Sequence, residues 1–419
     1  MFLKKRIRML NDFLKNTIKI MSSSSLAQLT VICITPLLTQ FFSPEEFGIY
    51  AFYISVCTIF GSIANGKFDI AIMLPKKNID SVNIFILSIL ISFTFSVLIL
   101  IVLYLFKNLI FRNEYVVFVK LYYVFPITIF FIALNSSILS FFNRQTAYNE
   151  IAKNNVIKST TNSFSSLFLG IKKIATGMII GNLISLTVTL LVNFSYIKNK
   201  INKRDIKRTL IISNFIKYID FIRFSTVSNF FNSVSSFGIT TIIILFFGPK
   251  VAGLYFLAEK IFAVPISILT SSISQVYFEK ASRLFYRDKF ELLQLTLKIQ
   301  KNIFKILFPS LLFLCLLGEI LLNILGEEWS KAGAILKFIS VYILFKNIYS
   351  PISHIGDILN KQKQLLLFNF SIFSFQVISF VALNNFNDLK LTLLTSSFFG
   401  AVHYILLDYY MKKELKKMI

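Results

Sequence analysis

Histidine and cysteine are scarce in this chain, which has two His and three Cys among 419 residues. Cys33, Cys57 and Cys315 lie far apart in apolar stretches without metal-ligand spacing, so we interpret them as small core residues. The sequence also lacks a G-x-x-x-x-G-K-[ST] phosphate loop, a G-x-G-x-x-G motif and a Ser/His/Asp set. These absences exclude ATP hydrolysis by this chain. They also leave no catalytic residue, metal site or cofactor to predict.

Polar residues are also too few to cover the surface of a soluble protein. Apolar residues make up 55% of the chain, 48 residues are Phe, and the mean hydropathy is +0.71, which is too apolar for a soluble globule of this length. Apolar runs long enough to cross about 30 Å of hydrocarbon cover nearly the whole sequence. We expect twelve spans, near Ser22–Phe42, Phe47–Gly66, Val82–Phe106, Tyr115–Phe142, Val156–Gly170, Ala175–Ile197, Phe221–Phe247, Val251–Ser274, Ile303–Leu325, Ala334–Ile352, Leu365–Leu383 and Leu391–Tyr410.

The fifth span is the exception to this apolar pattern. It is short and is interrupted by Ser159, Thr160, Thr161, Asn162 and Ser163, so it could be a buried span that does not face lipid. If it is not a helix, the count becomes eleven and the two halves of the chain are no longer equal.

The distribution of basic residues supports twelve spans. Loops that stay in the cytoplasm retain Lys and Arg, and twelve spans from a cytoplasmic start place 32 of the 44 basic residues on that side. We therefore expect a multi-pass protein of the cytoplasmic (inner) membrane with both termini in the cytoplasm. The net charge of +24 is dispersed over short loops, which favours anionic lipid headgroups over nucleic acid as a partner. The basic and apolar N-terminal residues predict a short interfacial helix.

One segment occurs twice. FFSPEEFGIY at Phe41–Tyr50 returns as FFGPKVAGLY at Phe246–Tyr255, 205 residues later. We interpret the chain as two parallel six-helix repeats, with an N-terminal lobe at 1–200, a basic cytoplasmic linker at 201–217 and a C-terminal lobe at 218–419. In each copy the proline ends a helix, and Gly48 or Gly253 lets the next helix pack closely. Tyr50 and Tyr255 are expected at the membrane interface.

Polar side chains form a stripe along the seventh span. Ser225, Asn229, Asn232 and Ser236 recur at three- and four-residue steps, and the 205-residue offset relates Gln28 of the first span to the same region. Such a stripe can line a central cavity or can supply hydrogen bonds between helices without a cavity. Both interpretations stay open.

Charged residues inside spans are costly and often mark transport pathways. Glu259 lies about 15 Å into the eighth span by helical rise, next to Lys260. Lys67, Arg144 and Arg223 lie near predicted span ends, where long side chains reach water cheaply. For these three cations a functional and a structural role are both open.

Several segments resemble the Wzx-type lipid-linked oligosaccharide flippases, the polysaccharide branch of the multidrug/oligosaccharidyl-lipid/polysaccharide (MOP) exporter superfamily. FFSPEEFGIYAFYIS and GKFDIAIMLP are similar to the first hairpin of that family, which usually has Arg in place of Lys67. Phe246–Ala281 is similar to its eighth-span motif, with Lys260 at a position that is often Arg, and Leu325–Gly333 to its ninth-to-tenth turn. The resemblance covers the chain to about residue 340; the last two spans match by hydropathy only.

This resemblance implies an all-α, MATE/MOP-like, V-shaped and two-lobed transporter with about twelve transmembrane helices and no enzymatic activity. It implies flipping of an undecaprenyl-pyrophosphate-linked oligosaccharide to the outer leaflet by alternating access, for O-antigen or capsular polysaccharide assembly. The implied partners are this lipid-linked substrate and polysaccharide polymerase or assembly proteins. Lysine at two family-arginine positions supplies point charges where a bidentate fork is usual.

The implied site residues fall into three groups: the pyrophosphate path cations Lys67, Arg144, Arg223 and Lys260; the glycan-facing stripe of Gln28, Ser225, Asn229, Asn232 and Ser236; and Asp69, Glu259 and Glu319 as candidates to bind a coupling proton or sodium ion.

Three alternatives stay open. A multidrug exporter of the same superfamily would share the fold, with a more apolar or acidic cavity. A membrane-embedded polysaccharide polymerase would be an enzyme of similar hydropathy with a large periplasmic loop, and the sequence offers no loop of that size. A peptidoglycan-precursor flippase would usually have two further spans.

Overall fold

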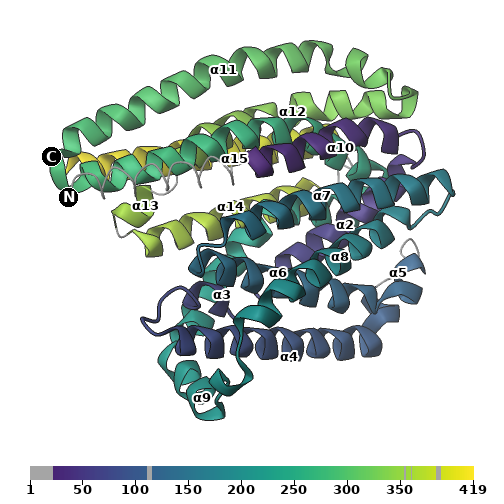
Figure 1. Ribbon diagram of the computed structural model, residues 1–419. Helices are drawn as coiled ribbons and strands as arrows, with labels where there is room; N and C mark the ends of the chain where they lie inside the picture. The colour runs from purple at the N-terminus through teal and green to yellow at the C-terminus, as the bar shows by residue number, and fades with distance from the viewer. Residues whose placement is uncertain (1–21, 111–115, 353–354, 360, 384–387) are drawn as a thin grey trace. The chain divides into compact units, whose positions relative to one another are not determined.

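The computed structural model describes residues 22–110, 116–352, 355–359, 361–383 and 388–419 (Figure 1). All regular structure within these residues is helical. The predicted interfacial helix at the N-terminus lies outside the described residues. The chain divides into two compact units, which are described separately: residues 22–41 with Tyr53–Ser233, and Phe42–Phe52 with Val234–Ile419.

The first unit holds the helices of the N-terminal half and the segment that follows them. Its members, in order, are Ser22–Leu38, the second half of α2 (Pro44–Gly61), α3 (Phe68–Ala71), α4 (Asn78–Ile110), α5 (Val116–Leu121), α6 (Val124–Arg144), α7 (Tyr148–Ile171), α8 (Gly177–Lys200), a 3₁₀ turn at Lys203–Asp205, α9 (Arg208–Lys217), a π-helical turn at Phe221–Thr226 and the first residues of α10 (Val227–Arg287).

The second unit holds the start of α2 and the C-terminal helices. Its further members are most of α10, α11 (Lys289–Asn323), α12 (Glu327–Tyr349), a 3₁₀ turn at Ser350–Ile352, α13 (Ile355–Ile358), α14 (Gln362–Leu383) and α15 (Leu389–Lys416). Figure 1 shows α11 and α12 as a long hairpin closed by a tight turn.

The multi-span helical fold that the sequence predicts is confirmed. Among the described residues, eight helices are long and apolar enough to cross a membrane. One of them, Phe221–Ile261, contains the whole seventh predicted span and the first part of the eighth, joined at Gly248, where φ is 79°. With the shorter helix Ser22–Leu38, with α2 and α7, and with the two parts of α10 counted separately, the described helices match the twelve predicted spans.

Helix α7 corresponds to the polar fifth span and is continuous over 24 residues. Its fully buried residues are all small or polar, Asn154 and Ser166 among them. Its exposed residues include Phe164 and Phe168, which are 58% and 60% exposed. The helix therefore keeps polar groups inside the unit and turns aromatic rings outward, as a helix in lipid should.

The duplicated turns pack against each other within the second unit. A Cβ atom on Gly48 would lie 1.8 Å from the carbonyl oxygen of Pro249, and one on Gly253 would lie 1.8 Å from that of Pro44. The close packing predicted for both glycines is confirmed, and the contact is reciprocal.

The interfacial position predicted for the two tyrosines is wrong. Tyr50 and Tyr255 are only 7% and 4% exposed, and the Tyr50 ring lies edge-on to Phe256 at 5.9 Å. The physical reason is the glycine contact itself. Where two backbones touch, the side chains one or two positions further along each helix are enclosed by the partner helix.

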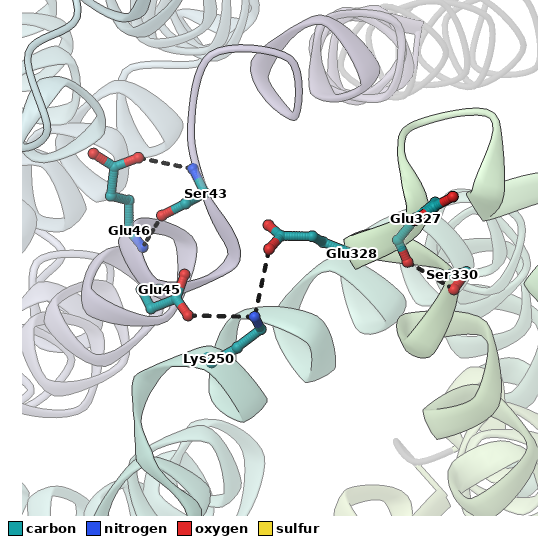
Figure 2. A network of polar contacts seen from close by, with 7 residues as sticks. All are labelled: Ser43, Glu45, Glu46, Lys250, Glu327, Glu328 and Ser330. Atoms are coloured by element: carbon teal, nitrogen blue, oxygen red, sulfur yellow. Dashed lines mark hydrogen bonds and ion pairs between the residues drawn. The ribbon is translucent and has the colours of Figure 1, made fainter.

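Charged groups tie the same turns together, as Figure 2 shows. The backbone N–H of Ser43 donates to Glu46 (2.7 Å) and the N–H of Glu46 donates to the Ser43 hydroxyl (3.3 Å), a capping box that begins α2. Lys250 lies 3.7 Å from Glu45 and 3.5 Å from Glu328 at the start of α12. Because these ion pairs are exposed, they add little stability and mainly fix how the three helix starts are arranged.

Candidate functional site

The first unit holds a cavity of about 340 Å³ that is largely open to the outside. Its walls come from the first helix, Ser22–Leu38, and from α7 and α8. The lining residues are Ser24, Ala27, Gln28, Val31, Asn155, Lys158, Ser159, Asn162, Asn182 and Ser185. Hydroxyl and amide groups predominate among them, and one lining residue, Lys158, is basic.

The polar wall follows from the spacing of polar residues along α7. Asn155, Ser159 and Asn162 are separated by four and three residues, which places them on one helix face. Asn155 Nδ2 donates to the Ser24 hydroxyl at 3.2 Å, and the Ser159 hydroxyl donates to the carbonyl oxygen of Ala27. These two bonds attach α7 to the first helix along the cavity.

Other hydrogen bonds hold α8 in place. Asn193 of α8 donates to Asn154 on another face of α7 at 2.7 Å. The hydroxyl of Tyr53 on α2 donates to Oδ1 of Asn182 at 3.4 Å and pairs with Thr128 of α6 at 2.5 Å. The cavity walls are therefore fixed by interhelical hydrogen bonds, which are the usual polar contacts between membrane helices.

Two cavity groups keep unused bonding capacity. The Asn162 side-chain oxygen is buried and accepts no hydrogen bond within the described residues. In the same part of the chain, no carboxylate lies within ion-pair distance of the half-buried Lys158 ammonium. A buried acceptor needs a hydroxyl or N–H partner, and a buried ammonium needs an anion or several acceptors. The cavity thus suits a ligand with both negative charge and hydroxyl groups.

Of the predicted site residues, Gln28 lies on the cavity wall. Lys158, Asn155 and Asn162 were missed as site residues. Their signal is present in the polar start and interruption of the fifth span, but Lys158 lies only two residues from the expected beginning of that span. Hydropathy averages over a helix and cannot tell a polar face turned inward from a helix end in water.

A second group of predicted residues gathers around α3 in the first unit. Lys67, at the start of α3, has left-handed backbone dihedrals (φ 59°), and its N–H donates to Asn65 Oδ1 at 3.0 Å. Asp69 is 5% exposed and accepts a 2.7 Å hydrogen bond from Ser136 of α6. The π-helical turn that carries Arg223 also contacts α3, and Arg223 is exposed.

Arg144 has a clear local role. Its guanidinium donates to the carbonyl oxygens of Met73 (3.0 Å) and Pro75 (2.6 Å), and to the side chain of Asn78 at 3.4 Å. These contacts hold the loop between α3 and α4 against the end of α6. The planar fork of arginine matches two neighbouring carbonyl groups well.

The stripe on the seventh span is divided among different environments. Asn229 donates to the carbonyl oxygen and the hydroxyl of Ser62 at the end of α2, at 3.2 and 3.0 Å. This is the interhelical alternative for that residue. Asn232 is exposed, whereas Ser225 and Ser236 are half-buried. None of these four residues is among those that line the cavity.

In the second unit the predicted charges lie in two places. Glu259 and Lys260 are half-buried on α10; Glu259 interacts electrostatically with Lys346 of α12, and Lys260 Nζ lies 5.7 Å from the centre of the Phe256 ring. Glu319 of α11 instead forms an exposed ion pair with Lys337 of α12 at 2.6 Å. Its carboxylate is therefore already engaged.

Comparison with known proteins adds a family and a fold. A family model described as polysaccharide biosynthesis protein matches residues 37–334. None of the curated proteins matches the chain.

Solved structures of transporters resemble the whole chain. An inward-facing multidrug resistance MATE family transporter of the MOP superfamily shares 15% identity over 95% of both chains, with a TM-score of 0.71. The outward-facing conformation of such a transporter gives a TM-score of 0.64 at 15% identity, covering 96% of this chain and 95% of that one. A third structure is a MOP superfamily transporter from Pyrococcus furiosus, described as having a binding pocket of reverse polarity that suggests a different function. It gives a TM-score of 0.61 at 15% identity, covering 96% of this chain and 95% of that one. At these identities the likeness concerns the fold.

Proposed function

The chain belongs to the polysaccharide biosynthesis protein family, and on that premise we propose that it flips undecaprenyl-pyrophosphate-linked oligosaccharide from the cytoplasmic to the outer leaflet. The glycan would then enter O-antigen or capsular polysaccharide assembly, with polymerase and assembly proteins as partners. A multi-pass helical fold like that of the MOP transporters supports a transport role.

The observation that carries the proposal is the cavity around Lys158. This lysine lies ten residues into α7, about 15 Å along the helix, where an uncompensated charge costs about 2.5–3.5 kcal/mol on insertion scales. A pyrophosphate would neutralise this charge, and the ammonium would replace water around the phosphate oxygens. The glycan hydroxyls would meet Gln28, Asn155 and the open acceptor of Asn162.

The four cations expected on the pyrophosphate path have different roles in this proposal. Lys67, Arg223 and Lys260 have no ion pair within the described residues and remain candidates to contact the pyrophosphate. Arg144 already binds loop carbonyls, so we propose for it a structural role. Among the polar residues, Ser225, Asn232 and Ser236 remain candidates for glycan contact.

Ion coupling is assigned by the same reasoning. We propose Asp69 and Glu259 as the groups that bind a coupling proton or sodium ion, since Asp69 is buried just after the second span and Glu259 is half-buried within the eighth. Glu319 is the weaker candidate because it is paired with Lys337 near the surface.

The test uses a strain that lacks this chain and is complemented with variants. We expect the deletion to leave lipid-linked oligosaccharide on the cytoplasmic leaflet and to remove surface glycan. Lys158→Gln should reduce restored surface glycan about tenfold or more, because it removes one charge-assisted contact of about 1.5–3 kcal/mol, while Lys158→Arg should retain activity. Lys153→Gln is the matched control, since Lys153 lies on the same helix, exposed and paired with Glu150.

Three outcomes would count against the proposal. Wild-type surface glycan with Lys158→Gln at a normal membrane level would remove the cavity from the pathway. Lipid-linked repeats that reach the outer leaflet unpolymerised in the deletion strain would instead favour the polymerase alternative. Increased retention of a dye or drug, with normal surface glycan, would favour the multidrug exporter.

A further inference from the structure

The segment between the sixth and seventh spans is a structured element with two different surfaces. Helix α9 is ten residues long, RTLIISNFIK, and Asn214 is its buried residue. Leu210 and Ile211 lie on the same side and are half-buried, and Ile211 packs against the hydrophobic core of the first unit. This face anchors the helix, and the other face is open.

Specific hydrogen bonds fix where α9 lies along the first unit. Asn83, fully buried on α4, donates to the carbonyl oxygen of Asp205 at 2.8 Å and accepts from the N–H of Lys207 at 2.9 Å. The Phe215 ring stacks on Phe68 of α3 at 6.2 Å. Asn83 is five residues from the first residue of α4, or about 8 Å by helical rise. The helix therefore lies beside the N-terminal end of α4, where that candidate membrane span begins (Figure 1).

The open face of α9 is apolar. Ile212 and Ile216, four residues apart, are 50% and 66% exposed, whereas Phe215 is 36% exposed and borders this face, because its ring stacks on Phe68. One turn apart on the helix, the two isoleucines form an apolar stripe. An aliphatic stripe exposed to water would be unfavourable, so a covering phase or partner is needed.

The charges around this stripe decide what covers it. Four exposed basic residues, Arg204, Lys207, Arg208 and Lys217, flank the stripe in the sequence, and within the described part of this segment Asp205 is the acidic residue between them. A protein partner with an apolar patch would not require four cations. A leaflet containing anionic phospholipid satisfies both features, because aliphatic side chains enter the acyl boundary while ammonium and guanidinium groups meet phosphates.

We propose that α9 is a binding site for anionic phospholipid in the cytoplasmic leaflet, with Ile212 and Ile216 inserted below the headgroups and Arg208 and Lys217 binding their phosphates. The site is independent of the transported substrate. It couples the segment between the two repeats to the composition of the membrane.

The experiment uses the full chain in nanodiscs, in a Trp329→Phe parent that removes the single native tryptophan and keeps a ring in the buried site against Phe47. A tryptophan is placed at Ile212 or at the neighbouring Ser213, which is exposed about 100° around the helix. Lipids brominated on their acyl chains quench tryptophan on contact. We expect strong quenching of Ile212→Trp and weak quenching of Ser213→Trp.

The preference of the site for anionic lipid is measured by placing the bromine on either the anionic or the zwitterionic lipid. At a fixed lipid mixture, brominated phosphatidylglycerol should quench Ile212→Trp more than brominated phosphatidylcholine, and Arg208→Gln with Lys217→Gln should remove most of this difference. Each basic residue near the surface contributes about fivefold to local lipid enrichment. Equal quenching at 212 and 213, or by the two lipids, would overturn the proposal. So would loss of quenching at 212 together with a crosslink from 212 to a second copy.

Discussion

At the scale of single residues, Arg144 and Lys158 show that two cations of similar sequence context differ in what their charge meets. Arg144 donates to two backbone carbonyls and one amide of the α3–α4 loop. Lys158 lies in a polar cavity without an ion pair in the described part of the chain. The first charge is used to hold the fold, and the second stays available to a ligand.

Arg144→Lys should therefore lower thermal stability. An ammonium cannot reach the carbonyls of Met73 and Pro75 with the fixed geometry of a guanidinium, so at least one charge-assisted hydrogen bond worth about 1.5–3 kcal/mol is lost. We expect a melting temperature lower by several degrees in detergent, measured by the decay of the monomer peak in size-exclusion chromatography. Arg223→Lys, at an exposed position, is the control and should melt as the parent does. An unchanged melting temperature for Arg144→Lys combined with lost transport would indicate a substrate contact.

Two residues of the cavity wall, Gln28 and Lys158, differ in how well the sequence predicts them. Gln28 could be predicted as a lining residue because the internal repeat related it to the polar stripe of the seventh span. Lys158 could not, because a lysine beside Asn and Ser has the composition of a cytoplasmic loop. Only the packing of α7 against the first helix and α8 shows that this polar face lines a cavity.

At the scale of elements, helix pairs are held by small residues as much as by apolar burial. Gly333 of α12 packs directly on α11: a Cβ there would lie 2.4 Å from the backbone nitrogen of Glu319. Gly318, on the opposite side of the same interface, has more room, since its Cβ would lie 3.7 Å from the Cα of Gly333. The two glycines look equivalent in sequence and differ in the structure.

Gly333→Ala and Gly318→Ala should thus behave differently. The added methyl group at 333 must push two backbones apart, which also strains the Glu319–Lys337 pair, so we expect a large fall in melting temperature and in membrane yield. The methyl group at 318 makes ordinary contacts and removes a helix-interior glycine, worth about 0.8–1 kcal/mol in favour of alanine. Gly318→Ala should melt at or slightly above the parent. Equal melting of the two variants would mean that the α11–α12 contact is looser than described.

At the scale of the whole molecule, the two copies of the repeated segment meet in a reciprocal contact, in which the glycine of each copy meets the proline carbonyl of the other. The sequence could predict the twelve helices and the turn because hydropathy and Pro/Gly chemistry are local properties. The division into compact units depends on long-range contacts, and two of its limits, after Phe52 and after Ser233, lie inside α2 and α10. No local composition signal accompanies a division inside a continuous helix.

The number of membrane crossings is the whole-molecule property that one pair of reporters can test. Helix α7 is about 36 Å long by helical rise, which is enough to cross, and its exposed Phe164 and Phe168 suit lipid, although its hydropathy is below that of the eight evident spans.

If α7 crosses, alkaline phosphatase fused after Lys173 is periplasmic and active. A fusion after Ile419 is then cytoplasmic and inactive, and a fluorescent protein at the same position is bright. If α7 does not cross, every later span is inverted, so the fusion after Lys173 is inactive and the one after Ile419 is active. A fusion after Gln145, before α7, should be inactive in both cases and controls for fusions that reach the periplasm by misinsertion.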